Sequence, residues 1–215
     1  MNRRVFPLIL LILIFNVGCT RTKKEYWSNG TKKSEIHIKS DGYEGKATWW
    51  YEDGQKQLEC FYKNNLLDSI MTRWYNTGTK QEEAHYKKNK LDGTTVIWDR
   101  KGNLASKGTY KDGALNGTYM EWYGDGTKKM EGNFINGNYD GYWIYYDYMG
   151  RIIGEAIFIN GNGKQKAYYD NGQLKEEVSY LHNLKDGKDI KYGLDGKVEM
   201  IKSYKADSLV SIDMK

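Results

Sequence analysis

A glycine recurs every 24 residues through most of the chain, and this period constrains the fold more than any other feature. An aromatic residue stands four positions before each glycine, and a large apolar residue stands eight positions after it. The glycines are Gly30, Gly54, Gly78, Gly102, Gly126, Gly150, Gly172 and Gly196. The preceding aromatics are Tyr26, Trp50, Trp74, Trp98, Trp122, Tyr146, Tyr168 and Tyr192. The following residues are Ile38, Tyr62, Tyr86, Tyr110, Phe134, Phe158, Tyr180 and Tyr204. A period of about 20 to 50 residues indicates a repeat architecture.

A second glycine follows about fifteen residues after the first, usually behind Asp or Asn, and is expected in a tight turn. These glycines are Gly45, Gly93, Gly117, Gly141 and Gly187, with Ser69 and Ser211 as substitutes. Each repeat is therefore predicted to hold two short strands and two turns. From Gly150 to Gly172 the spacing is 22 residues, and we expect a compressed turn at Gly161-Asn162-Gly163 with a bend or shifted register. The alternative is a neutral deletion in a turn.

Residue alternation predicts half-buried antiparallel strands. Six residues after the first glycine stand small or apolar residues: Ile36, Cys60, Ala84, Gly108, Gly132, Ala156 and Val178. Glutamates occupy the preceding position: Glu35, Glu59, Glu83, Glu131, Glu155 and Glu177. Lysines are expected as their cross-strand partners: Lys32, Lys56, Lys80 and Lys128. With 24 Gly, 19 Tyr, 7 Trp and one Pro, the composition also favours strands and tight turns over helices.

These units resemble the MORN repeat, specifically the variant of bacterial exported proteins and of the YwqK-type antitoxin family. The shared pattern is visible in Trp122-Tyr123-Gly124-Asp125-Gly126, followed by Phe134, Gly137 and Gly141. The resemblance covers residues 26–215 as about eight repeats of about 24 residues. It implies an all-β fold in which antiparallel hairpins form one elongated twisted sheet.

The N-terminus resembles a bacterial lipoprotein signal. Arg3 and Arg4 precede the apolar segment 5–15, which is too short for the roughly 20 residues of a membrane-spanning helix. The following segment, 16–19, ends in Cys19 and resembles a lipobox. The predicted organisation is a signal peptide at 1–18, a lipidated tether at 19–25 and the repeat domain at 26–215. Acyl chains such as palmitate on Cys19 would anchor the chain in the cell envelope, and Thr20 implies the outer membrane. An ordinary cleaved signal is the alternative.

The sequence offers little for catalysis or metal binding. His37 and His85 occupy equivalent positions two repeats apart, about 19 Å, so they cannot share a metal, and His182 stands elsewhere. The regular glutamate row indicates a solvated charge ladder rather than an acid–base pair. We therefore expect no metal, no cofactor and no enzyme activity. Cys60 is expected to act as a small buried hydrophobe.

The charge pattern does not indicate a nucleic-acid partner. There are 33 basic and 28 acidic residues, and they do not form one basic face or run. The densest cluster is Lys23, Lys24, Lys32 and Lys33 beside Cys19, which is either solvated or in contact with anionic lipid headgroups.

A second set of aromatic residues alternates with the main aromatic column and is predicted to form an exposed binding stripe, the alternative being a packing role. Its members are Trp49, Tyr51, Tyr75, Tyr119, Tyr123, Trp143 and Tyr145. Tyr and Trp are favoured at interfaces. The leading hypothesis is an anchored envelope lipoprotein that acts as a non-catalytic protein-interaction scaffold. The alternatives are an antitoxin that binds a toxin directly and a carbohydrate or cell-wall binding module.

Overall fold

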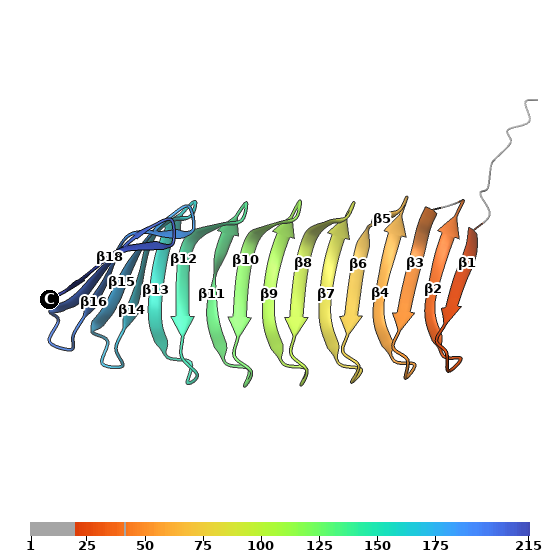
Figure 1. Cartoon of the computed structure of the whole chain (residues 1–215), viewed down its shortest axis with the longest axis horizontal. Coiled ribbons are helices and arrows are strands. Elements are labelled where there is room, and N and C mark those ends of the chain that lie inside the picture. The colour runs from red at the N-terminus through yellow and green to blue at the C-terminus, as the bar shows by residue number, and fades with distance from the viewer. Residues whose placement is uncertain (1–19, 41) are drawn as a thin grey trace, which may run out of the picture.

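The computed structural model describes residues 20–40 and 42–215 and folds them into one open antiparallel sheet (Figure 1). In this part of the chain, 18 strands follow one another in sequence order, and each pairs with its neighbours along the chain, except that β5 and β6 do not pair with each other and both pair with β4. No helix occurs among these residues. The strands are β1 (Thr20–Tyr26), β2 (Lys32–Lys39), β3 (Gly42–Trp50), β4 (Lys56–Lys63), β5 (Leu66–Leu67), β6 (Ser69–Trp74), β7 (Lys80–Lys87), β8 (Lys90–Trp98), β9 (Leu104–Lys111), β10 (Ala114–Trp122), β11 (Lys128–Ile135), β12 (Asn138–Tyr146), β13 (Ile152–Ile159), β14 (Asn162–Tyr168), β15 (Leu174–Leu181), β16 (Leu184–Tyr192), β17 (Val198–Lys205) and β18 (Ser208–Met214).

Two kinds of turn connect the strands. The longer turn contains the 24-residue glycine: the amide of Gly54 donates to the carbonyl of Tyr51 at 3.0 Å, and Gly54 has a φ of 86°. The shorter turn has two residues with positive φ, as at Asn64 (50°) and Asn65 (65°). These dihedrals suit the right-handed twist of a hairpin, and Asn tolerates them better than most residues. The predicted pair of strands and turns in each repeat is therefore confirmed.

The second glycine lies inside a strand and not in a turn, which corrects the prediction. Gly93, with a φ of 122°, lies in β8 where the pairing jumps from Tyr86↔Leu91 to Ala84↔Thr95. Extra residues in one strand of a pair form a β-bulge, and positive φ there favours glycine. The second glycine of each repeat thus bends the second strand of its hairpin.

The second repeat has Ser69 in place of this glycine, and Ser69 adopts a φ of 101°. The bulge at Asp68 and Ser69 divides the strand into β5 and β6. This division and the additional strand β1 account for 18 strands where eight two-stranded repeats predict 16.

The shortened repeat lacks the bulge. Strands β13 and β14 pair without a register shift from Gly154↔Ala167 to Ile159↔Asn162. The predicted compression at Gly161-Asn162-Gly163 is wrong, because the turn keeps its two residues at positions 160 and 161, and β14 begins at Asn162. The missing residues are those of the bulge.

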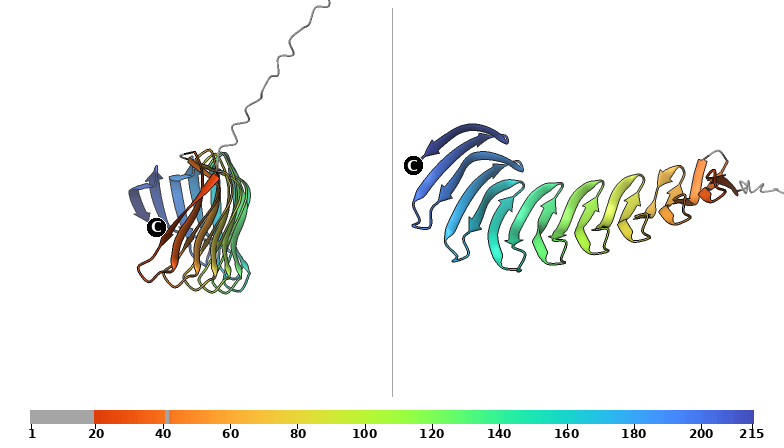
Figure 2. Two further views of the ribbon diagram at one scale, coloured as in Figure 1. Left: turned by 90° about the vertical axis from the view of Figure 1, so that its right-hand side faces the viewer. Right: turned by 60° about the horizontal axis from the view of Figure 1, so that its bottom comes forward.

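The array bends at its C-terminal end, as the shortened repeat predicts. In Figure 2 the strands from β14 onward curl out of the line followed by the preceding strands. At the turn edge, Asn183 contacts the hairpin two repeats back: its Nδ2 donates to the carbonyl of Gly137 at 3.1 Å, and its Oδ1 accepts from the amide of Tyr139 at 3.0 Å. The array therefore bends where the bulge is missing and where the turns of hairpins two repeats apart lie within hydrogen-bonding distance.

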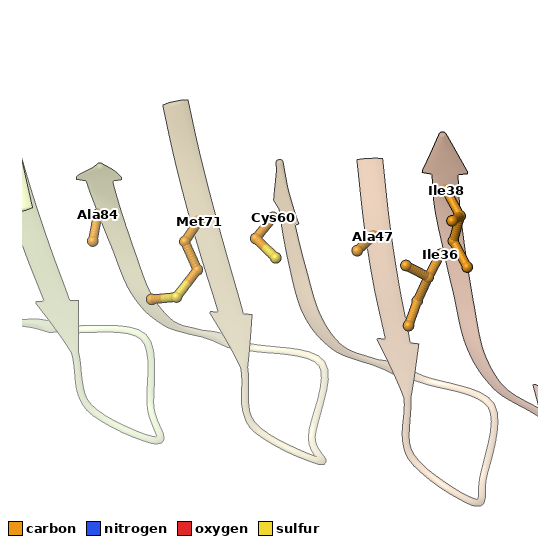
Figure 3. Close-up of a cluster of buried hydrophobic side chains, with 6 residues drawn as sticks. All are labelled: Ile36, Ile38, Ala47, Cys60, Met71 and Ala84. Atoms are coloured by element: carbon orange, nitrogen blue, oxygen red, sulfur yellow. The ribbon is translucent and has the colours of Figure 1, made fainter. Parts of the chain in front are cut away.

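One face of the sheet, here called the packed face, carries the buried apolar side chains. Its first cluster contains Cys60, at 1% exposure, between Ala47 and Ala84, both at 0% (Figure 3). The second cluster surrounds Trp143 with Phe134, Tyr139 and Phe158. The small residues predicted for one face are therefore buried, and Cys60 acts as one of them.

The repeat array begins earlier than predicted. Residues 20–25, expected in the tether, belong to strand β1, which pairs with β2 from Thr20↔Lys39 to Tyr26↔Lys32. Cys19 and the predicted signal at 1–18 lie outside the described residues. Among the residues described, no helix is long and apolar enough to span a bilayer.

Candidate interaction surface

The face opposite the packed face carries a repeated polar and aromatic unit, and we call it the ladder face. A row of paired residues crosses its strands in the order Glu35, Thr48, Glu59, Thr72, Glu83. The two threonines are buried, at 4% and 8% exposure, and alternate with the three glutamates. Successive glutamates are two strands apart, about 10 Å.

Each complete unit consists of a lysine, a glutamate and an aromatic ring. In one unit, Lys56 Nζ lies 2.9 Å from Glu59 Oε2 and 5.4 Å from the ring centroid of Trp74. The other units are Lys32–Glu35 (2.5 Å) with Trp50 (4.8 Å), Lys80–Glu83 (2.6 Å) with Trp98 (5.6 Å), and Lys128–Glu131 (2.8 Å) with Tyr146 (5.8 Å). A cation over an aromatic face within about 6 Å is attracted by the ring quadrupole.

The lysines do not lie across the strand from the glutamates, as the sequence predicted, but on the same strand three residues earlier. Residues three apart in a regular strand point to opposite faces. Here the pairing jumps from Trp49↔Leu58 to Trp50↔Lys56, so Gln57 is an extra residue. This irregularity returns Lys56 to the face of Glu59.

The charged form is favoured at two of these glutamates, Glu59 and Glu131. Hydrogen bonds from Lys128 and Tyr146 lower the pKa of Glu131. Burial alone would raise the pKa of Glu59, but hydrogen bonds from Lys56 and Lys46 outweigh it and lower the pKa. Acid–base catalysis by two carboxyls needs one pKa that is raised and one that is lowered. The pKa values of Glu59 and Glu131 are both lowered, so this row has the properties of the predicted charge ladder.

The predicted aromatic stripe is not exposed. Trp143 is 0% exposed and lies within 5.0 Å, centroid to centroid, of both Phe134 and Tyr139. Trp49, Tyr119 and Tyr145 are partly buried against the two clusters of the packed face. Period-two alternation correctly places these residues on one face. It does not reveal that side chains from neighbouring strands pack against them and shield them from solvent. Their role in binding stays a prediction.

The other members of the stripe connect adjacent repeats. Each begins a longer turn and donates its hydroxyl to a carbonyl 23 residues later: Tyr51 to Trp74 (2.8 Å), Tyr75 to Trp98 (3.0 Å) and Tyr123 to Tyr146 (2.8 Å). Where the position is Asp99, its carboxylate instead accepts bonds from the amides of Lys101 and Asn103 in its own turn. The 24-residue recurrence of Tyr was the sequence signal for these bonds.

The histidines have structural positions. His37 Nδ1 lies 2.7 Å from the carbonyl of Lys46, and His85 Nδ1 lies 2.9 Å from that of Thr94, each in a bulge. Across residues 20–40 and 42–215, no three His, Cys, Asp or Glu side chains are grouped to hold a metal ion. Burial raises the pKa of the Cys60 thiol to about 11, so its reactive thiolate form is disfavoured.

Comparison with known families fits this geometry. The model of the MORN repeat variant matches residues 43–64, 67–88, 91–112 and 161–182. Four segments of the chain are thus similar to the MORN repeat variant. Each matched segment holds the second strand of one hairpin, the longer turn and the first strand of the next, as β3 and β4 do within 43–64. MORN repeats are generally protein- or membrane-interaction modules and not catalytic ones. A search of curated proteins gives no match to the chain.

Proposed function

We propose that the chain is a membrane-anchored, non-catalytic scaffold that binds another protein along the ladder face. The ladder face itself carries this proposal. Its lysine–glutamate–aromatic units recur at the repeat spacing, and no second layer of the described chain covers the sheet (Figure 2). A partner with matching spacing could contact several units at once, and such multivalent contacts increase affinity.

The cation–aromatic contacts favour a protein over a glycan. A sugar ring that stacks on Trp50 or Trp98 would compete with Lys32 or Lys80, whose ammonium groups lie 4.8 Å and 5.6 Å from those rings. Carbohydrate or cell-wall binding therefore ranks below protein binding. Toxin neutralisation remains the second hypothesis, since it also requires a protein partner and rests on the family resemblance.

The lysines near the N-terminus give less support to the binding of anionic lipid. Lys23 lies 2.9 Å from Glu25, Lys24 lies 3.9 Å from Glu35, and Lys33 lies 4.7 Å from the ring of Trp27. Each of these charges has a partner within the chain. Membrane attachment is therefore assigned to acylation of Cys19, which directly precedes β1.

Cell fractionation tests the anchor. Cys19→Ser is expected to move most of the full-length chain from the membrane fraction to the soluble fraction. Cys60→Ala is the matched control, because Ala84 occupies the equivalent buried position in the next repeat. Equal membrane retention of both variants would refute anchoring through Cys19.

In-cell crosslinking and capture of the full-length chain test the ladder face. The ladder variant is Lys32→Gln, Lys56→Gln and Lys80→Gln together. The control replaces Lys88, Lys101 and Lys197 by Gln, an equal change of charge at exposed positions in the turns, outside the strands of the ladder face. We expect one dominant protein whose capture falls at least tenfold in the ladder variant alone. Equal capture by all three chains would refute this binding surface, whereas capture of no protein would favour a glycan or lipid.

A further inference from the structure

The C-terminal half of the ladder face carries an apolar patch where the rest of the array is charged. The position nine residues after the repeat glycine ends the first strand of each hairpin. It is occupied in order by Lys39, Lys63, Lys87, Lys111, Ile135, Ile159, Leu181 and Lys205. The three apolar members are exposed, at 43% for Ile135, 76% for Ile159 and 41% for Leu181. Since lysine occupies the same place in five other repeats, the fold does not require an apolar residue there.

Further exposed side chains extend the patch over adjacent strands. Tyr142, at 51% exposure, pairs with Ile157, at 64%. Leu184, at 40%, pairs with Leu181. Ala156 and Phe158 of β13 point to the packed face, so Ile157 and Ile159 point to the ladder face. We call Ile135, Tyr142, Ile157, Ile159, Leu181 and Leu184 the apolar patch.

The charges beside the patch are balanced. Lys164 Nζ lies 2.7 Å from Glu177 Oε1, and the hydroxyls of Tyr142 and Tyr168 donate to Glu155. With Lys166 nearby, two carboxylates face two ammonium groups. The carboxylates of Glu155 and Glu177 would repel an anionic bilayer. A strongly charged protein would gain little electrostatic attraction, because the positive and negative charges here cancel. A surface with the same balanced charges can place its ammonium groups against these carboxylates and its carboxylates against these ammonium groups.

We propose that the apolar patch pairs with the same patch of a second copy around a two-fold axis. At these exposed fractions the six side chains offer on the order of 100 Å² each, or about 600 Å² per copy. Two patches would bury about 1,200 Å² in total, which is the lower end for stable protein–protein interfaces. Such an interface is isologous, with equivalent residues on both copies. It leaves the ladder units of β2 to β8 free, so this self-association goes beyond the proposed binding of another protein.

Site-directed crosslinking of the full-length chain in intact cells tests the pairing. Ser179→Cys places a thiol beside Lys164 at the patch, and Thr109→Cys places one at the equivalent register of an earlier repeat. Both positions are partly exposed, and Cys60 is buried. With a flexible bis-maleimide, Ser179→Cys is expected to give a product of twice the monomer mass, and Thr109→Cys at least tenfold less.

Patch variants decide whether the apolar side chains cause the pairing. Adding Ile135→Lys, Ile159→Lys and Leu181→Lys to Ser179→Cys continues the lysine column and should reduce the dimer at least tenfold. Ile159→Lys alone should reduce it in the same direction, and Lys87→Gln should leave it unchanged. Resistance of Cys60 to maleimide and an unchanged protease pattern verify the fold. Absence of the dimer in Ser179→Cys, its persistence in the folded lysine variants, or a product with a different protein would overturn the proposal.

Discussion

The contact between Gly132 and Trp143 gives the sharpest test of packing in the array. A Cβ at Gly132 would lie 2.1 Å, 2.3 Å and 2.5 Å from three ring atoms of Trp143. The ring is 0% exposed and is held edge-to-face by Phe134 at 5.0 Å and Tyr139 at 4.9 Å. Gly132→Ala must therefore displace either the ring or the strand.

The smaller of two costs sets the expected effect. Expelling the Trp143 ring would expose on the order of 200 Å² and cost about 5 kcal/mol. A local shift that keeps the ring inside is an overpacking change and costs about 1 to 3 kcal/mol. We expect Gly132→Ala to destabilise the second cluster by about 2 to 3 kcal/mol, near the upper end of that range because both neighbours are rings.

Gly108→Ala is the matched control, because Gly108 has the same register one repeat earlier. Its added Cβ would lie 2.9 Å from Leu115 Cδ2, the end of a flexible side chain, and its distances to ring atoms, 3.2 Å for Tyr119 and 3.3 Å for Tyr110, are about 1 Å longer than those at Gly132. We expect a cost below about 1 kcal/mol, since alanine also loses less backbone entropy than glycine.

Hydrogen–deuterium exchange of β11 to β13 is the assay, because a repeat array can open locally. A loss of about 2 kcal/mol raises the exchange rate about 30-fold in these strands. In a Trp143→Ala background, Gly132→Ala should have little further effect. Unchanged exchange in Gly132→Ala, or an equal increase in Gly108→Ala, would refute the reasoning.

Three further substitutions test other features. Ser69→Gly should raise the urea midpoint by the equivalent of about 1 kcal/mol, because Ser69 has a φ of 101° that glycine adopts without strain; a lower midpoint would contradict this. Tyr75→Phe removes the hydroxyl that donates to the carbonyl of Trp98 at 3.0 Å and should cost about 1 kcal/mol, measured by the same midpoint, with no change refuting a role for that bond. Burial, followed by the charge and hydrogen bond of Asp189, raises the pKa of Glu176 above its ordinary 4.5. Its contribution to stability is therefore full below pH 4.5 and is lost as the pH rises through the folded-state pKa. Glu176→Gln should stabilise the C-terminal repeats at pH 7 relative to wild type and have little effect at pH 4; an unchanged difference between these pH values would oppose the assignment.

The 24-residue period was sufficient to predict the hairpins and their order, because each longer turn needs its glycine at positive φ. The location of the second glycine was not predictable from its Asp-Gly or Asn-Gly dipeptide, since turns and bulges both favour positive φ at such residues. Gly93 is distinguished only by the register of β7 and β8. The same limit applies to Lys56, whose face depends on the extra residue Gln57.

The site was less predictable than the fold for a related reason. Period-two alternation places Trp143 on one face, but its burial depends on the missing side chain of Gly132 on the adjacent strand. The apolar patch was visible in the sequence as a lysine column that changes to isoleucine and leucine. Its exposure requires knowledge of which positions share the ladder face.

The missing bulge in β14 suggests how the shape of such an array can evolve. A two-residue deletion removes the bulge of one hairpin, while β14 still pairs with β13 and β15 and both flanking turns are kept. The position of the bend along the array then depends on which hairpin lacks the bulge. Removing the bulge from another hairpin, or restoring it at β14, would move or straighten the bend and so change the relative direction of the surfaces on either side without altering a residue in the other repeats.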